Sequence, residues 1–232
     1  MLKVTDLHAG YGDSEVLHSI SLNVNEGEAV IVLGPNGHGK TTLLRAISGL
    51  LQPTAGSVEL NGTTLSHRRA EEIVAAGVIH IPQGDLVFPE MTVTENLLMG
   101  AYRAEAWRDR KQKFERVYQL FPILAERKNQ LARSLSGGER RMLALGRGLM
   151  GKAQILMIDE PSLGLAPLII EQLYETIKEI NQGGLSILLV DENADHITVA
   201  DRVYLLESGV LVREGTADEM LRDEALLATY LG

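Results

Sequence analysis

Five short apolar runs recur along the chain, and their composition predicts buried strands. They span residues 29–33, 78–81, 155–158, 187–190 and 203–206. None of these runs alternates cleanly between apolar and polar residues, as expected of strands that are covered on both faces. After the third run, apolar side chains recur at the spacing of one helix face, at Ile170, Leu173, Tyr174 and Ile177. Strands that alternate with helices in this way predict an α/β fold with a mostly parallel sheet.

Three other stretches have a different character. Residues 2–33 have the pattern of successive strands with turns at 10–12 and 25–27, which predicts an antiparallel β-lobe beside the parallel core. Residues from about 86 to 150 are helical in pattern and rich in charges of both signs. This predicts an inserted helical lobe whose charges form a solvated face rather than a binding patch. Residues 215–232 predict a short helical tail, and we expect residues 1–232 to form a single domain.

The composition narrows the classes of function. The 232 residues contain no cysteine, which excludes a disulfide framework, a thiolate zinc site, an iron–sulfur cluster and a cysteine nucleophile. A formal net charge of −9 and only 4% aromatic residues argue against a nucleic-acid partner, because such binding needs a basic surface and stacking side chains. No basic segment followed by an apolar run opens the chain, and no apolar run approaches the roughly 20 residues of a membrane span. The remaining expectation is a soluble cytoplasmic protein.

A glycine-rich segment lies between the apolar run 29–33 and a helical pattern, and it matches the phosphate-loop motif G-x-x-x-x-G-K-[ST]. Glycines let backbone N–H groups turn around an anion, and the positive end of the following helix points at the same place. Lys40 supplies a charge for the β- and γ-phosphates, and the Thr41 hydroxyl can ligate Mg²⁺. An ordinary glycine-rich turn is the alternative, and the placement between strand and helix argues against it. The predicted nucleoside-triphosphate site consists of Gly34, Pro35, Asn36, Gly37, His38, Gly39, Lys40, Thr41 and Thr42.

Two acidic residues directly follow the apolar run 155–158. Mg²⁺ prefers oxygen ligands and keeps most of its waters, so one nearby carboxylate suffices, and Asp159 is the candidate. Glu160 is adjacent and points elsewhere at a strand end, which suits polarisation of an attacking water. A solvated pair of acids is the alternative, and the phosphate loop upstream favours the catalytic interpretation.

A serine and two glycines lie between these motifs, within the segment 135–140. Ser136 and Glu139 have the spacing of a capping box, so a plain helix start is a sufficient explanation. However, Gly137 and Gly138 leave the helix N-terminus bare of side chains, and an exposed helix N-terminus is an anion site. One chain would then have two phosphate-binding surfaces. A head-to-tail dimer would use both, with each phosphate loop facing the Ser-Gly-Gly segment of the partner.

These motifs, in this order, resemble the ATP-binding cassette family, the nucleotide-binding subunits of ABC transporters, over essentially the whole chain. The resemblance implies a RecA-like P-loop NTPase core with an N-terminal β-lobe and a helical lobe, in which two cassettes close on two ATP–Mg²⁺. It implies that Tyr11 stacks on adenine and that Gln83 senses Mg²⁺ and the attacking water. It also implies that Ser136, Gly137 and Gly138 contact the nucleotide of the partner cassette.

The same resemblance implies a division of labour within each site. Lys40 and the phosphate loop hold the phosphates. Thr41 and Gln83 help to hold Mg²⁺, with Asp159 behind them, and Glu160 positions the water.

Three positions depart from the family pattern. The switch histidine is replaced by Glu192, whose carboxylate would repel a γ-phosphate at ~4 Å by a few kcal/mol. Glu192 therefore points away, bridges through water or Mg²⁺, or weakens hydrolysis, and His196 is a weaker candidate for the switch role. Ala166 replaces an aspartate that helps to couple the two sites of the dimer. His38 replaces a commoner small residue, with little expected effect.

Two stretches narrow the resemblance further. Residues 87–97 and 159–167 resemble the subunits of high-affinity branched-chain amino-acid importers and of related urea and amide importers. The implied partners are a second cassette, identical or homologous, transmembrane permease subunits and, indirectly, a solute-binding protein. The protein would then lie at the inner face of the cell membrane. Leu86, Phe88 and Pro89 are candidates for apolar contacts with the permease, unless they pack inside the helical lobe.

Rival functions share some of these motifs. One is a cassette ATPase with a different transport substrate, and another is a non-transport ATPase of the DNA-repair type. A repair ATPase would need a long heptad insertion between the phosphate loop and Ser136, and heptads are not evident there. A ribosome-associated protein would have two cassettes in one chain, and a non-hydrolysing binder would lack Glu160. An ATPase that powers the import of branched-chain amino acids or a related polar solute is therefore the favoured function.

Overall fold

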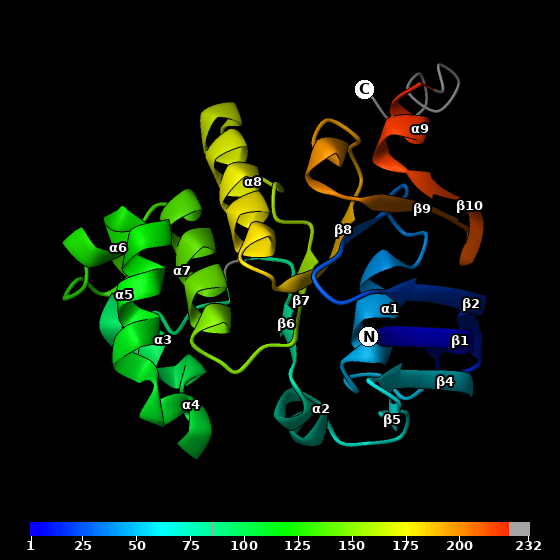
Figure 1. Ribbon diagram of the computed structural model, residues 1–232, viewed down its shortest axis with the longest axis horizontal. Coiled ribbons are helices and arrows are strands. Elements are labelled where there is room, and N and C mark those ends of the chain that lie inside the picture. Colours follow the sequence, from blue (N-terminus) through cyan, green and yellow to red (C-terminus); the bar gives the residue numbers. More distant parts are fainter. Residues whose placement is uncertain (85, 223–232) are drawn as a thin grey trace.

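The central sheet contains the five strands that the apolar runs predict. A computed structural model describes residues 1–84 and 86–222, and its six-stranded sheet runs in the order β10-β9-β3-β8-β7-β6 (Figure 1). All neighbouring strands are parallel except β10, which is antiparallel to β9. The mostly parallel α/β prediction is therefore confirmed. The strands are β3 (Ala29–Leu33), β6 (Val78–Ile81), β7 (Ile155–Asp159), β8 (Ser186–Asp191), β9 (Arg202–Glu207) and β10 (Val210–Thr216).

The β-lobe is a separate four-stranded antiparallel sheet in the order β2-β1-β4-β5. Its strands are β1 (Leu2–Tyr11), β2 (Ser14–Val24), β4 (Ala55–Leu60) and β5 (Thr63–Thr64). The predicted lobe thus contains residues 2–24, whereas residues 29–33 leave it and join the parallel sheet. Outside the helical lobe, the helices of the described residues are α1 (Lys40–Ile47), α2 (Ala70–Ala76), α8 (Pro167–Gln182), the 3-10 helix η2 (Ile197–Val199) and α9 (Ala217–Leu221).

The side chains of β3 alternate between two hydrophobic cores, which explains why this run is apolar throughout. Ile31 and Leu33 pack into a core with the helical lobe and α8, whereas Val30 and Val32 pack into a core with α1 and the β-lobe. Figure 1 shows the central sheet between these two layers. A strand that is buried on both faces has no polar side for alternation to mark.

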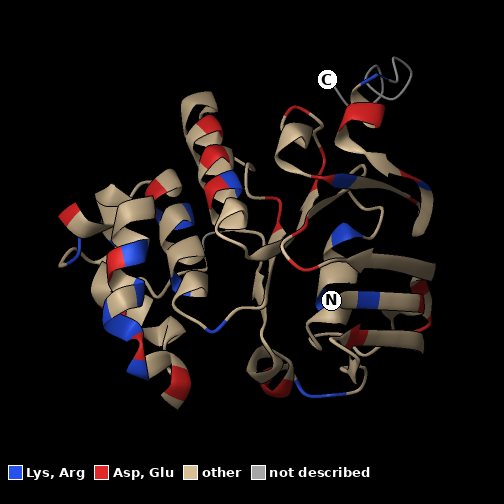
Figure 2. Ribbon diagram, in the orientation of Figure 1, with Lys and Arg blue, Asp and Glu red and all other residues tan. Residues whose placement is uncertain are grey.

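The helical lobe is built from residues 93–149. Its elements are α3 (Val93–Gly100), α4 (Ala104–Arg108), α5 (Arg110–Leu120), α6 (Pro122–Glu126), the 3-10 helix η1 (Ala132–Ser134) and α7 (Gly137–Leu149). Residues 86–92 lead into it and are not helical. Residues of both charge signs are spread along its helices, as the ribbon colours of α5 show in Figure 2. Of the predicted helical tail, α9 is described, and residues 223–232 lie outside the described residues.

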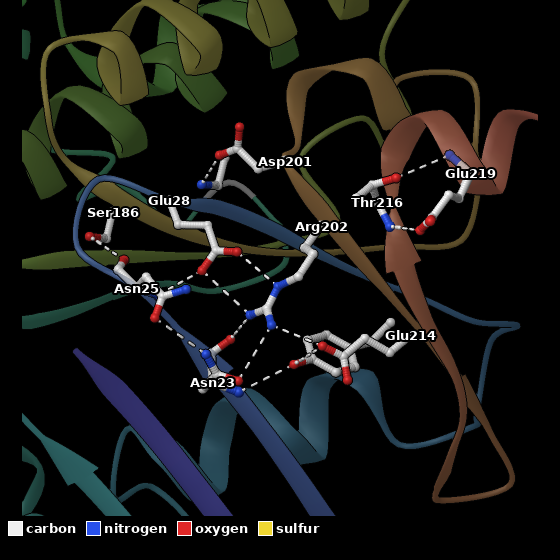
Figure 3. Close-up of polar contacts among 11 residues, drawn as sticks. Asn23, Asn25, Glu28, Ser186, Asp201, Arg202, Glu214, Thr216 and Glu219 are labelled. Carbon is white, nitrogen blue, oxygen red and sulfur yellow. Dashed lines mark hydrogen bonds and ion pairs between the residues drawn. The ribbon is translucent and has the colours of Figure 1, made fainter.

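Arg202 links the β-lobe to the central sheet through ion pairs and hydrogen bonds (Figure 3). Its Nε lies 2.8 Å from Glu28 Oε1, its Nη1 lies 2.9 Å from Glu214 Oε1, and its Nη2 donates to the backbone carbonyl of Asn23. The neighbouring Asp201 accepts a hydrogen bond at 2.9 Å from the first amide of β3. These contacts fix both ends of the β2–β3 connection, and so they fix the strand that leads into the phosphate loop.

In the described part of the chain, every helix is too short or too polar to span a membrane.

Candidate functional site

The candidate site lies at one edge of the central sheet, where four neighbouring parallel strands end. β3 leads into the phosphate loop, β8 into Glu192, β7 into Glu160 and β6 into Gln83. The carboxyl ends of parallel strands share one edge, so residues that are distant in sequence meet in a crevice there. A cavity of about 190 Å³ at this edge is lined by Asn36, Gly37, Gly39, Lys40, Thr41, Thr42, Gln83 and Glu160.

The phosphate loop depends on glycine at two positions. Gly39 precedes α1 with a φ of 107°, and a Cβ there would lie 2.8 Å from Leu17 Cδ2. A Cβ at Gly34 would lie 2.3 Å from the carbonyl oxygen of Leu206. No side chain among the described residues caps the start of α1, so its first N–H groups are available to an anion.

Lys40 is buried inside this loop, with only 3% of the residue exposed. Its Nζ donates hydrogen bonds to the carbonyl oxygens of Gly34 at 2.7 Å and Pro35 at 3.1 Å. It also forms an ion pair with Glu160 Oε1 at 3.1 Å. These three acceptors stabilise the buried ammonium at the cavity, where it can reach an anion.

Asp159 and Thr41 fit a magnesium site. Thr41 Oγ1 donates to Asp159 Oδ1 at 3.2 Å. Asp159 Oδ2 is buried and has no hydrogen-bond partner within residues 1–84 and 86–222. Burial raises the pKa of Asp159, and the hydrogen bond from Thr41 opposes this effect. A nearby divalent cation would favour the ionised carboxylate, and oxygen atoms are the ligands that Mg²⁺ prefers.

Glu160 is turned away from Asp159 by an unusual backbone conformation. Its φ is 43°, a left-handed value that few residues other than glycine adopt, and its N–H donates to the carbonyl of Val190 at 3.0 Å. Glu160 Oε2 accepts from Gln83 Nε2 at 2.7 Å, while Oε1 pairs with Lys40. The structure therefore brings a carboxylate, an amide and an ammonium together in one crevice.

Glu192 lies against the phosphate loop. Its Oε2 accepts a hydrogen bond at 2.7 Å from Asn36 Nδ2. Glu192 is therefore turned toward Asn36 of the phosphate loop, although it does not line the cavity itself. His196 does not share this position, because its ring stacks on Tyr174 with centroids 4.0 Å apart and 14° between the planes.

The backbone before Glu192 is anchored by Asp191, a buried residue that the sequence analysis missed. Asp191 Oδ1 accepts from the N–H of Glu192 at 2.7 Å, and Oδ2 accepts from the Tyr174 hydroxyl. Burial raises the pKa of both Asp191 and Tyr174. Tyr174 was predicted only as a member of an apolar helix face, where Leu173 and Ile177 are buried with it. The tyrosine on this apolar face was the signal that could have predicted a polar partner nearby, because a buried hydroxyl needs a hydrogen-bond partner.

Arg141 is the second residue that the sequence analysis missed. It is only 2% exposed, and it lies on the same face of α7 as Ala144 and Leu145, which are also buried. A charged residue on an otherwise apolar helix face was the signal that could have identified it, since arginine is almost never fully buried without partners.

Residues 136–138 form a separate surface of the chain. The predicted capping box forms at the start of α7: Ser136 Oγ accepts from the N–H of Glu139 at 3.3 Å, and the N–H of Ser136 donates to Glu139 Oε2 at 2.7 Å. Ser136 and Glu139 line a different cavity, of about 570 Å³, together with residues of α6 and α8. The structure does not bring this segment into the cavity of its own phosphate loop.

Tyr11 and His38 occupy the border of the site. Tyr11 ends β1, is 45% exposed, and accepts a hydrogen bond from Arg45 Nη1 at 3.2 Å. His38 Nδ1 accepts from the N–H of Ser208 at 3.0 Å, which ties the phosphate loop to the turn between β9 and β10. A small residue at position 38 would lose this side-chain bond but keep the backbone bond in which the Gly209 N–H donates to the carbonyl of residue 38 at 3.1 Å.

The candidate permease contacts lie on an open groove. Leu86 and Phe88 are 60% and 42% exposed, and Pro89 is exposed as well, so the alternative in which they pack inside the helical lobe is wrong. Leu86 and Phe88 line a groove of about 410 Å³ with Tyr102 and Arg147. The Arg147 guanidinium lies 5.2 Å from the centroid of the Phe88 ring.

Comparison with known proteins gives full-length matches. A family model described as ABC transporter matches residues 17–163. The chain is 40% identical to the high-affinity branched-chain amino acid transport ATP-binding protein BraG of Pseudomonas aeruginosa, over 100% of both chains. It is 36% identical to the probable branched-chain amino acid transport ATP-binding protein LivF of Archaeoglobus fulgidus, over 100% of this chain and 99% of that protein. Its identity to the lipopolysaccharide export system ATP-binding protein LptB of Escherichia coli is 31%, over 100% of this chain and 97% of that protein.

Solved structures are similar over the same length. The ADP conformation of an ATP-binding cassette of an ABC transporter has a TM-score of 0.84 and 25% identity, covering 100% of this chain and 98% of that one. A dimeric bacterial ABC transporter cassette has a TM-score of 0.81 and 25% identity, covering 94% of this chain and 99% of that one. The likeness includes the sheet core, the β-lobe and the helical lobe.

Proposed function

The chain belongs to the ABC transporter family as one of its ATP-hydrolysing cassettes, and on this premise we propose that it powers the import of branched-chain amino acids or a related polar solute. Residues 1–232 would form one cassette. Its substrate class is supported by full-length identities of 40% and 36% to proteins named for branched-chain amino acid transport. The LptB protein, named for lipopolysaccharide export, is less similar at 31%.

The convergence of Lys40, Glu160 and Gln83 in one cavity is the observation that carries the ATPase role. The free N–H groups of α1 and the Lys40 ammonium would hold the β- and γ-phosphates. Phosphate oxygens would then replace Glu160 as partners of Lys40. The released carboxylate of Glu160 becomes available to accept a hydrogen bond from the attacking water, and Gln83 remains within reach to orient it.

Magnesium fits this arrangement. Thr41 and Gln83 would help to hold the ion, and the Asp159 oxygen that lacks a partner among the described residues would lie behind them. When bound, Mg²⁺ supplies positive charge that neutralises the developing charge on the phosphate oxygens.

A second cassette would complete each site. Ser136 caps α7, Gly137 and Gly138 form its first turn, and Ser136 lines a different cavity from that of the phosphate loop. A head-to-tail dimer would place this helix N-terminus of one chain on the γ-phosphate held by the other. The second cassette would be a copy of this chain or a homologous one.

The remaining partners would be membrane subunits. Leu86 and Phe88, which line the groove with Arg147, lie a few residues after Gln83 in the chain. A permease segment in the groove would therefore contact the same loop that carries Gln83. The cassette would then lie at the cytoplasmic face of the cell membrane, and a solute-binding protein would act through the permease.

The transport proposal is tested by uptake. The tagged full chain is purified from detergent-solubilised membranes, its co-purifying subunits are identified, and the complex is reconstituted into vesicles. We expect ATP-dependent accumulation of radiolabelled leucine, isoleucine or valine, and no accumulation with Glu160→Gln. A complex that hydrolyses ATP but accumulates none of these amino acids and no related polar solute such as urea or an amide would contradict the substrate class.

A separate prediction concerns the unusual residue at the switch position. Glu192→Gln keeps an acceptor for Asn36 but removes a negative charge beside the phosphate loop. We expect the KM for ATP to fall by roughly threefold at low ionic strength, and the difference to shrink as salt is added. The exposed Glu171→Gln on α8 is the matched control and should leave the KM unchanged. An unchanged or higher KM for Glu192→Gln at low salt would show that Glu192 does not repel the nucleotide.

A further inference from the structure

We propose that Arg141 is a positioning residue that fixes Gln83 against Glu160 by holding the backbone on both sides of Gln83. The inference deepens the proposed ATPase role and rests on it for its catalytic consequence. Arg141 does not line the cavity of the phosphate loop, so it acts through the other two residues rather than on the nucleotide.

The contacts of the Arg141 guanidinium reach two segments of the site. Nη1 donates to the carbonyl oxygen of Gly84 at 3.0 Å and lies 3.5 Å from that of Pro82. Nη2 lies 3.5 Å from the backbone carbonyl of Glu160. One side chain of α7 thus bridges the residues before and after Gln83 and the turn that carries Glu160.

The Glu160 turn needs such support. Its backbone is in the left-handed region at φ 43°, a conformation that persists only where surrounding contacts enforce it. The side chains of Gln83 and Glu160 meet at 2.7 Å, and Arg141 contacts the main chain of Glu160 and of the two residues that flank Gln83. A shift of about 1 Å between such groups is enough to cost orders of magnitude in rate.

Arginine suits this position better than lysine or an apolar residue. Its planar guanidinium presents several N–H donors in a fixed fork, so one group can serve three carbonyl oxygens. The ammonium of lysine is a point charge and cannot span the same acceptors. Because Arg141 lies on α7, which is capped by Ser136, it also connects the Ser-Gly-Gly segment to the water-positioning residues of the same chain.

The first test measures whether Arg141 holds the backbone around Gln83, and it does not depend on ATP turnover. In the full chain, we expect Arg141→Gln to increase amide hydrogen exchange several-fold in the peptide covering residues 82–88, while exchange in α8 is unchanged. Lys113→Gln is the matched control, because Lys113 donates to the Met150 and Gly151 carbonyls at the other end of α7. This control should lower thermal stability without raising exchange in residues 82–88. Unchanged exchange in the Arg141 variant would overturn the proposal.

The second test is a double-mutant cycle on ATP hydrolysis. We expect Arg141→Gln to lower kcat by on the order of tenfold with little change in the KM for ATP, and Arg141→Lys to lose less. Because Arg141 acts through Gln83 as well as through the Glu160 turn, the same change in a Gln83→Ala background should cost clearly less than about tenfold, and the remaining loss would come from the contact with the Glu160 carbonyl. An equal loss in both backgrounds, or a kcat for Arg141→Gln at the level of the Lys113→Gln control, would overturn the positioning role. Failure of leucine uptake would not affect either test. Absence of ATP hydrolysis by the wild type would contradict the proposed function, and the exchange measurement would still show whether Arg141 holds the segment around Gln83.

Discussion

Glu160→Gln is expected to reduce the turnover of ATP by on the order of 10²–10³-fold while nucleotide affinity stays within about threefold. The amide cannot accept a proton from the attacking water, so the loss falls on kcat. The fold should be retained, because Lys40 keeps the carbonyl acceptors of Gly34 and Pro35 and a glutamine carbonyl can still accept from it. Gln83 can turn its own amide to keep the contact with residue 160.

Phosphate release under saturating ATP and fluorescent-nucleotide binding measure the two quantities separately. Glu171→Gln removes an exposed carboxylate from α8 and is the matched control, with wild-type turnover expected. Wild-type turnover in Glu160→Gln would remove Glu160 from the role of general base. A parallel loss of affinity and turnover would instead indicate that the substitution had disturbed the phosphate loop.

Lys40→Met is expected to weaken ATP binding by roughly 10–100-fold, because charge-assisted hydrogen bonds to phosphate oxygens are lost. It should also lower the free energy of unfolding by about 3 kcal/mol, since it leaves the carboxylate of Glu160 buried without its ion-pair partner. Both side chains of this pair are nearly inaccessible, at 3% and 7% exposure, so solvent screening offers little relief.

The double variant Lys40→Met with Glu160→Gln separates these two effects. Removal of the unpaired carboxylate should restore most of the lost stability, but not the nucleotide affinity. Isothermal titration and urea unfolding measure the two quantities, and Lys178→Met on the exposed face of α8 is the matched control. Full affinity in Lys40→Met would contradict the phosphate role of Lys40. A double variant no more stable than Lys40→Met would contradict the account of the buried pair.

Much of the fold follows from local patterns. Each of the five apolar runs becomes a strand of the central sheet, because a run that is apolar on both faces has no stable position except between two layers. Of the predicted helix face, Leu173, Tyr174 and Ile177 are buried as the spacing predicts, and Ile170 is half-buried. The sequence does not specify which sheet residues 29–33 join, since a strand that follows two lobe strands along the chain can pair with either sheet. Only the packing of both its faces assigns it to the parallel sheet.

The environment of the switch residue shows where local patterns fail. The sequence identified Glu192 as a departure but left its direction open, because a side chain at a strand end can turn several ways. Its partner Asn36 lies 156 residues away and meets it only because β3 and β8 are neighbours in the sheet. Tertiary packing likewise brings Asp191 and Tyr174 together, since α8 packs over the end of β8.

Local stretches of sequence specify the chemical groups that this protein offers to a nucleotide. The phosphate loop and the Asp159-Glu160 pair are each contiguous, and their backbone geometry depends on nearby glycines and on one strand end. Which of these groups contact each other depends on how the strands and helices pack. The order β3-β8-β7-β6 brings Lys40, Glu160 and Gln83 to one edge, and the packing of α7 places Arg141 behind them. Contacts between residues far apart along the chain are set by sheet order and burial, which no local pattern of residues specifies.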